Sequence, residues 1–412
     1  MSKTNSEREF DVIVWGATGF TGTLVAEYLM RQYGTDGDLK WAIAGRSKEK
    51  LEKLRQSLGV RPGDLETIVA DSFDKDSLAN LARRTRVVLT TVGPYALYGS
   101  SLVDACVEAG THYCDLAGEV QWIRKMIDQH QARAQQTGAR IVHCCGFDSV
   151  PMDIGVWFLQ DAAKQRYGAY CKSIALLVKA TKGTASGGTI ASMMNLIQES
   201  RKDRDVARIL VHPYSLNPEG ERDGPDKRDQ QSVLYDKNAQ SWTAPFVMAG
   251  VNTKVVRRSH ALLGYPYGKD FRYREAVMTG DGAAGWVKGA TMTAAIGGLV
   301  VGASFAPTRK LLQTFILPDP GEGPSPELQK TGFFNLMQIG ELPDGTLIQT
   351  RITGDQDPGY GSTSKMLSEC AVCLAKDAIA VGGGVWTPAS AMGGLLLERL
   401  RKNAGLTFEI RD

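Results

Sequence analysis

Residues 10–22 read FDVIVWGATGFTG, the most informative stretch of the chain. Its first six residues form an apolar run that is typical of a buried strand, and the glycines that follow predict a tight turn. A helical pattern begins at once and stops at Gly34. A strand, a glycine turn and a helix N-terminus in succession direct backbone N–H groups and the helix dipole at an anion. We therefore expect a dinucleotide pyrophosphate at Gly16, Ala17, Thr18, Gly19, Phe20, Thr21 and Gly22.

The glycine spacing leaves one alternative open. It is G-x-x-G-x-x-G rather than the commoner G-x-G-x-x-G, so the pattern alone is not specific, and a turn without a ligand is the alternative. Its position after a strand and before a helix favours the cofactor site.

The first 150 residues alternate between strand and helix patterns, which indicates a parallel α/β sheet. Two of the expected helices, 100–109 and 121–137, are each followed by a glycine, the usual C-terminal stop. Six strands in this order predict a Rossmann-type, doubly wound parallel sheet of the α/β class. The expected strands are 10–15, 39–44, 67–70, 87–91, 111–114 and 140–145.

The pattern changes after residue 150. We expect residues 1–150 to form the NADP-binding domain, 151–358 an inserted second α+β domain, and 359–412 a C-terminal segment that returns to the first domain. The second domain is expected to contain strands at 173–180, 254–258, 272–279 and 346–353 and a polar surface loop at 217–240.

The composition is that of an ordinary globular enzyme: of 412 residues, 43% are hydrophobic and 23% charged. A formal net charge of +3 with dispersed basic residues argues against nucleic acid as a partner. The seven cysteines are irregularly spaced, and no cluster has the spacing of a metal site, so we expect free thiols, a reducing compartment and no metal. The N-terminus is polar and lacks a signal-peptide pattern, so we expect a cytoplasmic protein.

Residues 289–307 contain no charged side chain, and small residues recur at every fourth position. A stripe of this kind lets helices approach each other closely. As a helix the segment would be about 27 Å long, barely the thickness of a bilayer's hydrocarbon core, and it is rich in Thr, Ser and Gly. A buried helix or an apolar wall of the substrate site is the favoured interpretation. Peripheral contact with lipid at the inner face of a membrane is the second, and a true span is the third.

The residues after the second expected strand distinguish an NAD site from an NADP site. NAD enzymes commonly place Asp or Glu there to bind the ribose 2′-hydroxyl, whereas this chain has AGRSK at 44–48. Arg46 can bind a 2′-phosphate and Ser47 can add a hydrogen bond, so NADP is expected. The alternative is that Arg46 merely begins a solvated helix. Asp71 and Ser72 would lie beside the adenine, and Val92, Gly93 and Pro94 beside the nicotinamide.

Six motifs resemble the saccharopine dehydrogenase-like oxidoreductase family. They are GATGFTG at 16–22, AGRS at 44–47, VGPY at 92–95, YCDLAGE at 113–119, CGFDSVP at 145–151 and GYG at 359–361. The match runs nearly end to end and is closest to the trans-acting enoyl reductase branch. The resemblance implies an NADP-binding Rossmann domain, an inserted domain and an association with lipid metabolism or membranes. Trans-acting enoyl reductases reduce a double bond in a polyketide-derived lipid chain. Saccharopine reductases handle a charged amino acid, for which this chain has no evident cluster of arginines.

The expected reaction is hydride transfer to an electrophilic carbon, followed by protonation of the neighbouring atom. Tyr95 and Tyr98 flank the expected nicotinamide loop and are candidate proton donors; for each, a packed aromatic is the alternative. Asp148 could be an acid whose pKa burial raises, although we favour a helix cap at this position. Asp115 and Glu119 are explained by helix capping.

These observations favour an NADPH-dependent reductase of an enoyl or carbonyl group on an apolar, lipid-linked substrate. One open alternative is a non-catalytic dinucleotide-binding protein at a lipid surface. The other is an amino-acid dehydrogenase of the saccharopine type. A homodimer is also left open.

Overall fold

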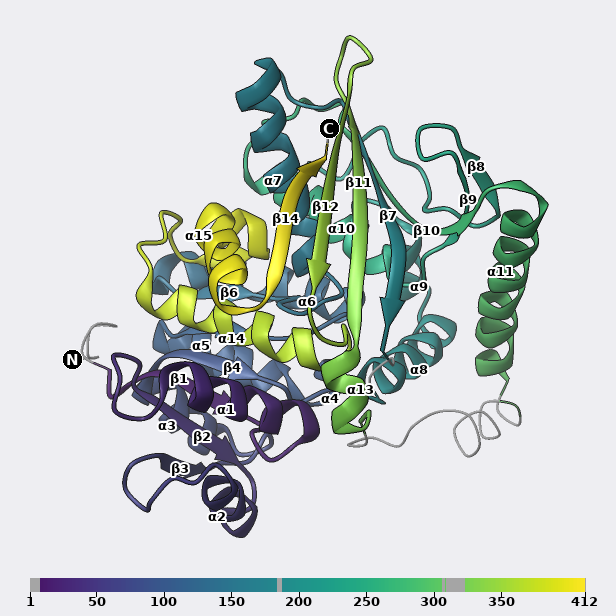
Figure 1. The fold of residues 1–412 in the computed structure, drawn as a ribbon. Helices are drawn as coiled ribbons and strands as arrows, with labels where there is room; N and C mark the ends of the chain where they lie inside the picture. The colour runs from purple at the N-terminus through teal and green to yellow at the C-terminus, as the bar shows by residue number, and fades with distance from the viewer. Residues whose placement is uncertain (1–7, 184–186, 306–307, 309–322, 412) are drawn as a thin grey trace. The chain divides into compact units, whose positions relative to one another are not determined.

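The computed structural model describes residues 8–183, 187–305, 308 and 323–411, which divide into two compact units (Figure 1). The first unit comprises Met1–Phe147, Gly321–Gly323 and Gly359–Ala404. The second comprises Asp148–Pro320, Pro324–Pro358 and Gly405–Asp412. The expected C-terminal segment, 359–412, is therefore divided between the units, because β14 (Leu406–Arg411) pairs with β12 (Leu347–Gly354) in the sheet of the second unit.

The first unit contains a seven-stranded parallel sheet in the order β13-β6-β5-β4-β1-β2-β3. Its strands are β1 (Phe10–Trp15), β2 (Trp41–Gly45), β3 (Glu66–Val69), β4 (Thr85–Thr90), β5 (His112–Cys114), β6 (Arg140–Val142) and β13 (Gly384–Trp386). This is the doubly wound order, so the predicted fold class is confirmed, and the reversal of strand order lies between β1 and β4. All six expected strands are present; β13, which adds an edge, was not predicted.

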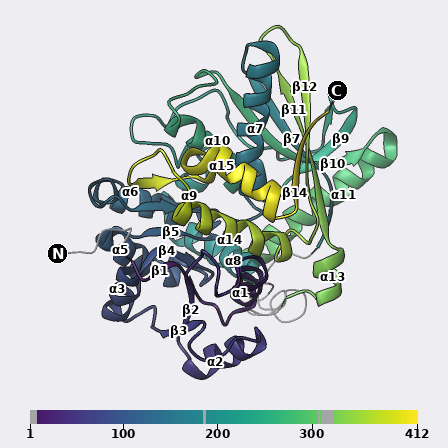
Figure 2. The ribbon, with the colours of Figure 1, turned by 60° about the vertical axis from the view of Figure 1, so that its left-hand side comes forward.

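Helices cover the faces of this sheet. They are α1 (Phe20–Tyr33), α2 (Lys48–Ser57), α3 (Lys75–Arg84), α4 (Tyr95–Tyr98), α5 (Ser100–Ala109), α6 (Val120–Thr137), α14 (Gly361–Lys376) and α15 (Pro388–Asn403). Helix α14, far away in sequence, packs beside α1 (Figure 2). The buried carboxylate of Glu369 on α14 joins them, because it accepts hydrogen bonds from the hydroxyls of Tyr28 at 2.7 Å and Tyr33 at 2.6 Å.

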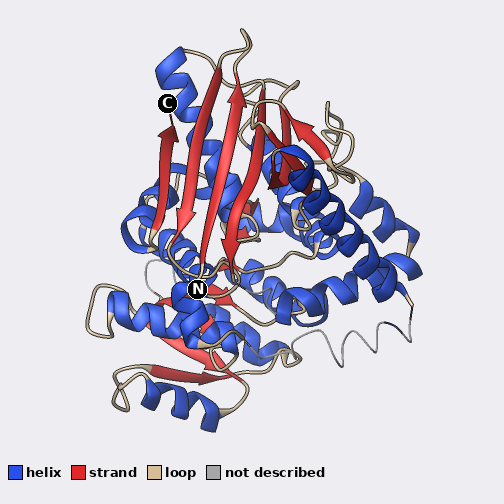
Figure 3. Cartoon of the chain, turned by 45° about the vertical axis from the view of Figure 1, so that its right-hand side comes forward, coloured by secondary structure: helices blue, strands red, loops and turns tan. Residues whose placement is uncertain are grey.

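The second unit contains a seven-stranded mixed sheet in the order β14-β12-β11-β7-β10-β9-β8 (Figure 3). Only β7 and β10 pair in parallel. The remaining strands are β7 (Ser173–Lys182), β8 (Leu234–Asp236), β9 (Ser241–Pro245), β10 (Arg272–Gly280) and β11 (Phe333–Glu341). The helices are α7 (Val150–Tyr167), α8 (Gly187–Lys202), α9 (Arg204–Val211), α10 (Ala249–Leu262), α11 (Gly282–Ser304) and α13 (Pro326–Thr331).

The strand predicted at 254–258 is wrong, because these residues lie in the middle of α10. Every residue from Val251 to Ala261 is buried, so the helix shows no exposed polar face from which a helical period could be recognised. The adjacent β-branched residues Val255 and Val256 therefore led to the prediction of a strand, because such residues favour strands.

The helix expected in the apolar segment at 289–307 is present over its described part, but the expectation that it is buried is wrong; an apolar wall of the substrate site stays a prediction. Residues 289–304 belong to α11, and only 11% of the most apolar stretch of this helix is buried. Helix α11 is the one helix of the described residues that is long and apolar enough to cross a membrane. Residues 306 and 307 lie outside the described residues.

Candidate cofactor and active site

Glycine is required at two positions of the turn between β1 and α1. Gly16 has a φ of +85°, and a Cβ added there would lie 2.5 Å from Cγ2 of Val92. A Cβ on Gly22 would lie 2.1 Å from the carbonyl oxygen of Gly16, so α1 approaches the turn this closely only without a side chain. The N-terminus of α1, at Gly19, receives no side-chain cap. Its first N–H groups are left for a ligand, and this cradle fits a pyrophosphate.

Hydrogen bonds hold the turn against the neighbouring strand. The N–H groups of Gly16 and Ala17 donate to the carbonyl of Ala44 at 3.0 and 3.2 Å. Thr18 is half-buried in the turn, and Phe20 and Thr21 open α1. The ring of Phe20 packs edge-on against Tyr360, with centroids 4.7 Å apart.

Arg46 follows β2 directly, is exposed, and has no ion pair or hydrogen bond to any residue that the structure describes. A free guanidinium at this position fits the 2′-phosphate of NADP. Ser47 is the N-cap of α2, because its hydroxyl oxygen accepts the N–H of Lys50 at 3.3 Å. The hydroxyl can still donate its proton to a ligand, so the cap and the cofactor contact are compatible.

The residues predicted beside the adenine shape the turn that follows β3. The carboxylate of Asp71 accepts the N–H of Phe73 at 2.9 Å, and the side chain of Ser72 is buried. Asp71 is half-buried and therefore remains within reach of a ligand.

The loop after β4, predicted to lie beside the nicotinamide, is tied to the glycine turn. Thr91 donates its N–H to the carbonyl of Trp15 at 3.1 Å and its hydroxyl to the carbonyl of Gly16 at 3.2 Å. Val92 is half-buried and contacts the turn at Gly16, as the tight space around that glycine shows. Gly93 is exposed, and Pro94 precedes α4. The two loops are thus brought together at the point where the strand order reverses.

Tyr95 is held inside the protein. Its hydroxyl donates to the carbonyl of Thr90 at 3.2 Å and accepts the N–H of Leu116 at 3.1 Å. Its ring stacks on Trp122, with centroids 5.6 Å apart, and burial raises the pKa of the Tyr95 hydroxyl well above its usual value. A buried hydroxyl whose bonds are used within the protein favours the packed-aromatic alternative over proton donation.

Tyr98 has a different environment. It is half-buried, and its hydroxyl has no hydrogen-bond partner among the residues that the structure describes. Its ring lies edge-on to the exposed Phe73, with centroids 5.8 Å apart. Tyr98 therefore stays a candidate for contact with the substrate.

Asp148 does not cap α7, so the favoured interpretation of this residue is wrong. The N-cap position is Ser149, which makes no side-chain cap bond, and the half-buried carboxylate of Asp148 has no hydrogen bond within the described chain. Burial without a compensating partner raises the pKa of Asp148 to about 6. A carboxyl group in this condition can carry a proton near neutral pH.

Glu119 and Asp115 also have roles other than the predicted capping of α6. Helix α6 has no side-chain cap at its N-cap residue, Glu119. Instead the buried carboxylate of Glu119 accepts the N–H groups of Tyr95 at 2.7 Å and Ala96 at 2.9 Å, and so fixes the start of α4. Asp115 accepts the N–H of Cys144 at 3.1 Å and pairs with Nδ1 of His143 at 2.7 Å, which joins the ends of β5 and β6.

These contacts reach across the sheet, so local spacing could not reveal them. The available signal was that both carboxylates follow a strand, where side chains from neighbouring strands meet. Among the described residues no group of His, Cys, Asp and Glu could hold a metal ion.

The sequence of this chain is similar to a known domain family and to known proteins. Residues 12–142 match the model of the saccharopine dehydrogenase NADP binding domain, which confirms NADP as the cofactor. A Mycobacterium tuberculosis protein named as a trans-acting enoyl reductase is 40% identical over 96% of both chains. A trans-acting enoyl reductase of Mycobacterium ulcerans is 36% identical over 96% of this chain and 97% of its own length.

A solved structure supports the fold. The saccharopine dehydrogenase of Saccharomyces cerevisiae that forms L-glutamate superposes with a TM-score of 0.55, at 11% identity, over 98% of this chain and 99% of its own. This likeness concerns the fold alone.

Proposed function

The chain belongs to the family of trans-acting enoyl reductases, and from that premise we propose that it reduces an enoyl or carbonyl group on an apolar, lipid-linked substrate. That it is an NADP-dependent oxidoreductase follows from its relatives and from its NADP-binding domain. The proposal concerns the substrate and the proton donor.

One observation carries the choice of an apolar substrate over a charged amino acid. The buried arginines of the second unit are already engaged: Arg257 pairs with Asp226 at 2.9 Å, and Arg258 donates to the carbonyl of Leu216 at 2.5 Å. Binding the carboxylates of saccharopine in an enclosed site would require buried cations that are free to face the ligand. Lys227 and Arg228 of this unit have no partner within the described chain, but they are exposed on its surface. The second unit instead exposes the apolar helix α11.

Three residues of the chain have proposed roles in positioning, proton donation and substrate binding. When bound, NADPH supplies the hydride and becomes NADP⁺. Glu119 holds the backbone of the loop at Tyr95 and Ala96, so it is a positioning residue for the nicotinamide site. The protonated carboxyl of Asp148 donates its proton to the carbon next to the one that receives the hydride, and the C=C bond is thereby saturated. The hydroxyl of Tyr98 can donate a hydrogen bond to the carbonyl of the substrate.

The test measures cofactor turnover by the purified protein in both directions. NADPH oxidation is followed with long-chain enoyl thioesters and long-chain aldehydes, and NADP⁺ reduction is followed with amino acids including saccharopine, which can only donate a hydride. We expect turnover with the enoyl thioesters and, more slowly, with the aldehydes. Turnover restricted to an amino acid would establish the saccharopine-type alternative. Tight NADPH binding without turnover in any class would establish the non-catalytic alternative.

A further inference from the structure

Helix α11 presents an apolar surface outside its own unit. Large apolar side chains of this helix are exposed: Trp286, Val287 and Val301 are 49%, 56% and 59% exposed. From residue 289 to the end of the helix no side chain is charged, and Lys288 is the one cation of the helix. A continuous apolar surface of this length is characteristic of a docking site for a partner or a lipid.

The same helix lies along its unit and does not project from it. Near its N-terminus a Cβ on Gly285 would lie 2.1 Å from the carbonyl of Gly280, and one on Gly289 would lie 3.1 Å from Val233. At the other end Ala303 is fully buried, and the guanidinium of Arg201 on α8 lies 5.4 Å from the ring centroid of Phe305. Contacts at both ends hold the helix along its unit, which favours lipid contact in the plane of the interface.

Helix α9 adds a second, amphipathic element. None of its residues is buried, although it contains Ile209, Leu210 and Val211, and Val211 is 60% exposed. Helix α8 packs against both α9 and α11 and ends in Arg201 and Lys202. The three helices are therefore neighbours, and between them they carry exposed apolar side chains and basic ones, of which Arg208 is paired with Asp205 at 2.8 Å.

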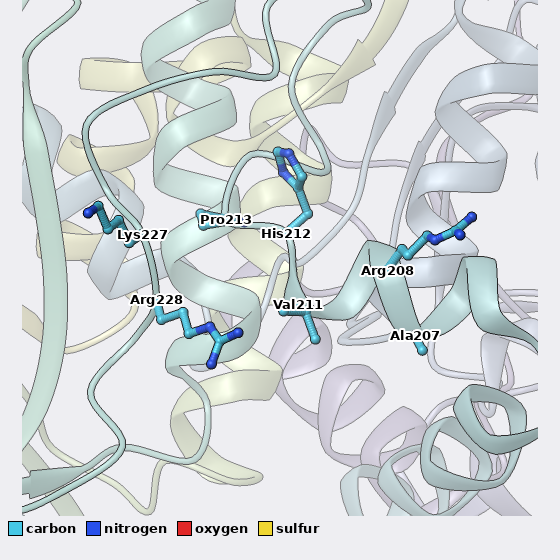
Figure 4. Close-up of a pocket in the computed structure, with 7 residues that line it drawn as sticks. All are labelled: Ala207, Arg208, Val211, His212, Pro213, Lys227 and Arg228. Atoms are coloured by element: carbon cyan, nitrogen blue, oxygen red, sulfur yellow. The ribbon is translucent and has the colours of Figure 1, made fainter.

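A basic hollow of about 670 Å³ lies beside α9 (Figure 4). It is lined by Ala207, Arg208, Val211, His212, Pro213, Lys227 and Arg228, with no acidic residue among them. Lys227 and Arg228 are exposed and have no partner among the described residues. Exposed cations that border apolar side chains match the headgroups and acyl chains of an anionic lipid.

We propose that α9, α11 and the basic hollow bind the surface of an anionic membrane, with α11 lying flat in the interface. Charge favours this occupant over a second copy of the chain, because the unpaired cations Lys227 and Arg228 are attracted to anionic headgroups, whereas a two-fold axis through the hollow would set like charges against each other. The inference deepens the proposed function, since a lipid-linked substrate would be presented at the same surface.

The experiment is flotation of the whole protein with vesicles of phosphatidylcholine, with and without phosphatidylglycerol, at low and high salt. Binding should require phosphatidylglycerol and weaken with salt. The double variant Lys227→Glu/Arg228→Glu should lose at least about twentyfold in affinity, since each cation contributes roughly fivefold. Val301→Asp should weaken binding as well, because it places a charge in the apolar contact.

The matched control is Lys53→Glu/Arg61→Glu, which makes the same change in charge on the exposed surface of the first unit. It should bind vesicles as the unmodified protein does. The proposal is overturned if no variant differs from this control, if the protein does not float with anionic vesicles, or if sedimentation shows a dimer that Val301→Asp dissociates. Turnover of a water-soluble, short-chain enoyl thioester by the same variants separates the two hypotheses, because it tests the reductase without the membrane.

Discussion

Two polar side chains at the strand ends of the first sheet lack hydrogen-bond partners among the described residues, whereas polar side chains on helix α10 of the second unit are buried and paired. At the strand ends, the N-terminus of α1 has no side-chain cap, and the guanidinium of Arg46 and the hydroxyl of Tyr98 have no hydrogen-bond partner in the described chain. On α10, Arg257 is buried and paired with Asp226, and Asn252 donates to the buried Glu275 at 3.0 Å. Unsatisfied polar groups therefore indicate where a ligand binds, whereas buried and paired groups indicate the structural framework.

Removing a paired cation from α10 should have the largest effect. In Arg257→Met, the carboxylate of Asp226 stays largely buried without its partner, so the free energy of unfolding should fall by about 3–5 kcal/mol. Urea unfolding measures this loss, and Arg61→Met, at an exposed pair, should cost at most about 1 kcal/mol. An equal loss of unfolding free energy in the two variants would contradict the role of Arg257 in the structural framework.

Asp148→Asn should lower kcat/KM for the enoyl substrate about a hundredfold, because it removes the proposed proton donor. With the pKa of Asp148 raised to about 6, the donor form is lost as pH rises through that value. The rate of the unmodified protein should therefore fall above about pH 6, and that limb should be absent from the variant. Asp161→Asn, on the exposed side of α7, is the control. An unchanged pH profile in Asp148→Asn would contradict the assignment.

Arg46→Ala should weaken NADPH binding by about ten- to a hundredfold, the worth of a charge-assisted hydrogen bond to phosphate, and leave NADH binding unchanged. Isothermal titration with each cofactor measures the preference. Lys48→Ala, two residues along the chain, should change it little. Equal affinity of the unmodified protein for the two cofactors would refute the role of Arg46.

Glu275→Gln should change the pH dependence of stability and leave cofactor preference as it is. Burial raises the pKa of Glu275 to about 8 from its usual 4.5, although the bonds from Asn252 and Tyr273 oppose the shift. The folded state thus holds a proton that the unfolded state has released, so stability should decline as pH rises from about 5 to about 8. The variant should flatten this decline when Tm is measured across the range. Parallel curves for the two proteins would show that Glu275 is not the group responsible.

The sequence predicted the first sheet well because each strand is short, apolar and bounded by a turn or helix signal. Candidate site residues in the glycine turn and at Arg46 could be proposed for the same reason, since their expected roles depend on the local backbone; those roles stay predictions. The second unit was less predictable. Helix α10 is buried on all sides and α11 is exposed on an apolar side, so both depart from the amphipathic pattern from which helices are recognised.

Long-range contacts account for the remaining errors. Glu119 binds a backbone segment 24 residues away, and β14 joins a sheet whose other strands come from the middle of the chain. No spacing rule connects such segments, because the fold brings them together only after the sheets have formed.

Transfer of isotope from the cofactor tests the central claim most directly. NADPH that carries deuterium at the transferable position of C4 is incubated with the protein and a long-chain enoyl thioester, and the product is examined by mass spectrometry. The account predicts one deuterium in the saturated chain, on the carbon that received the hydride, and no label from NADH at the same concentration. A saturated product without deuterium, or no product despite bound NADPH, would contradict it.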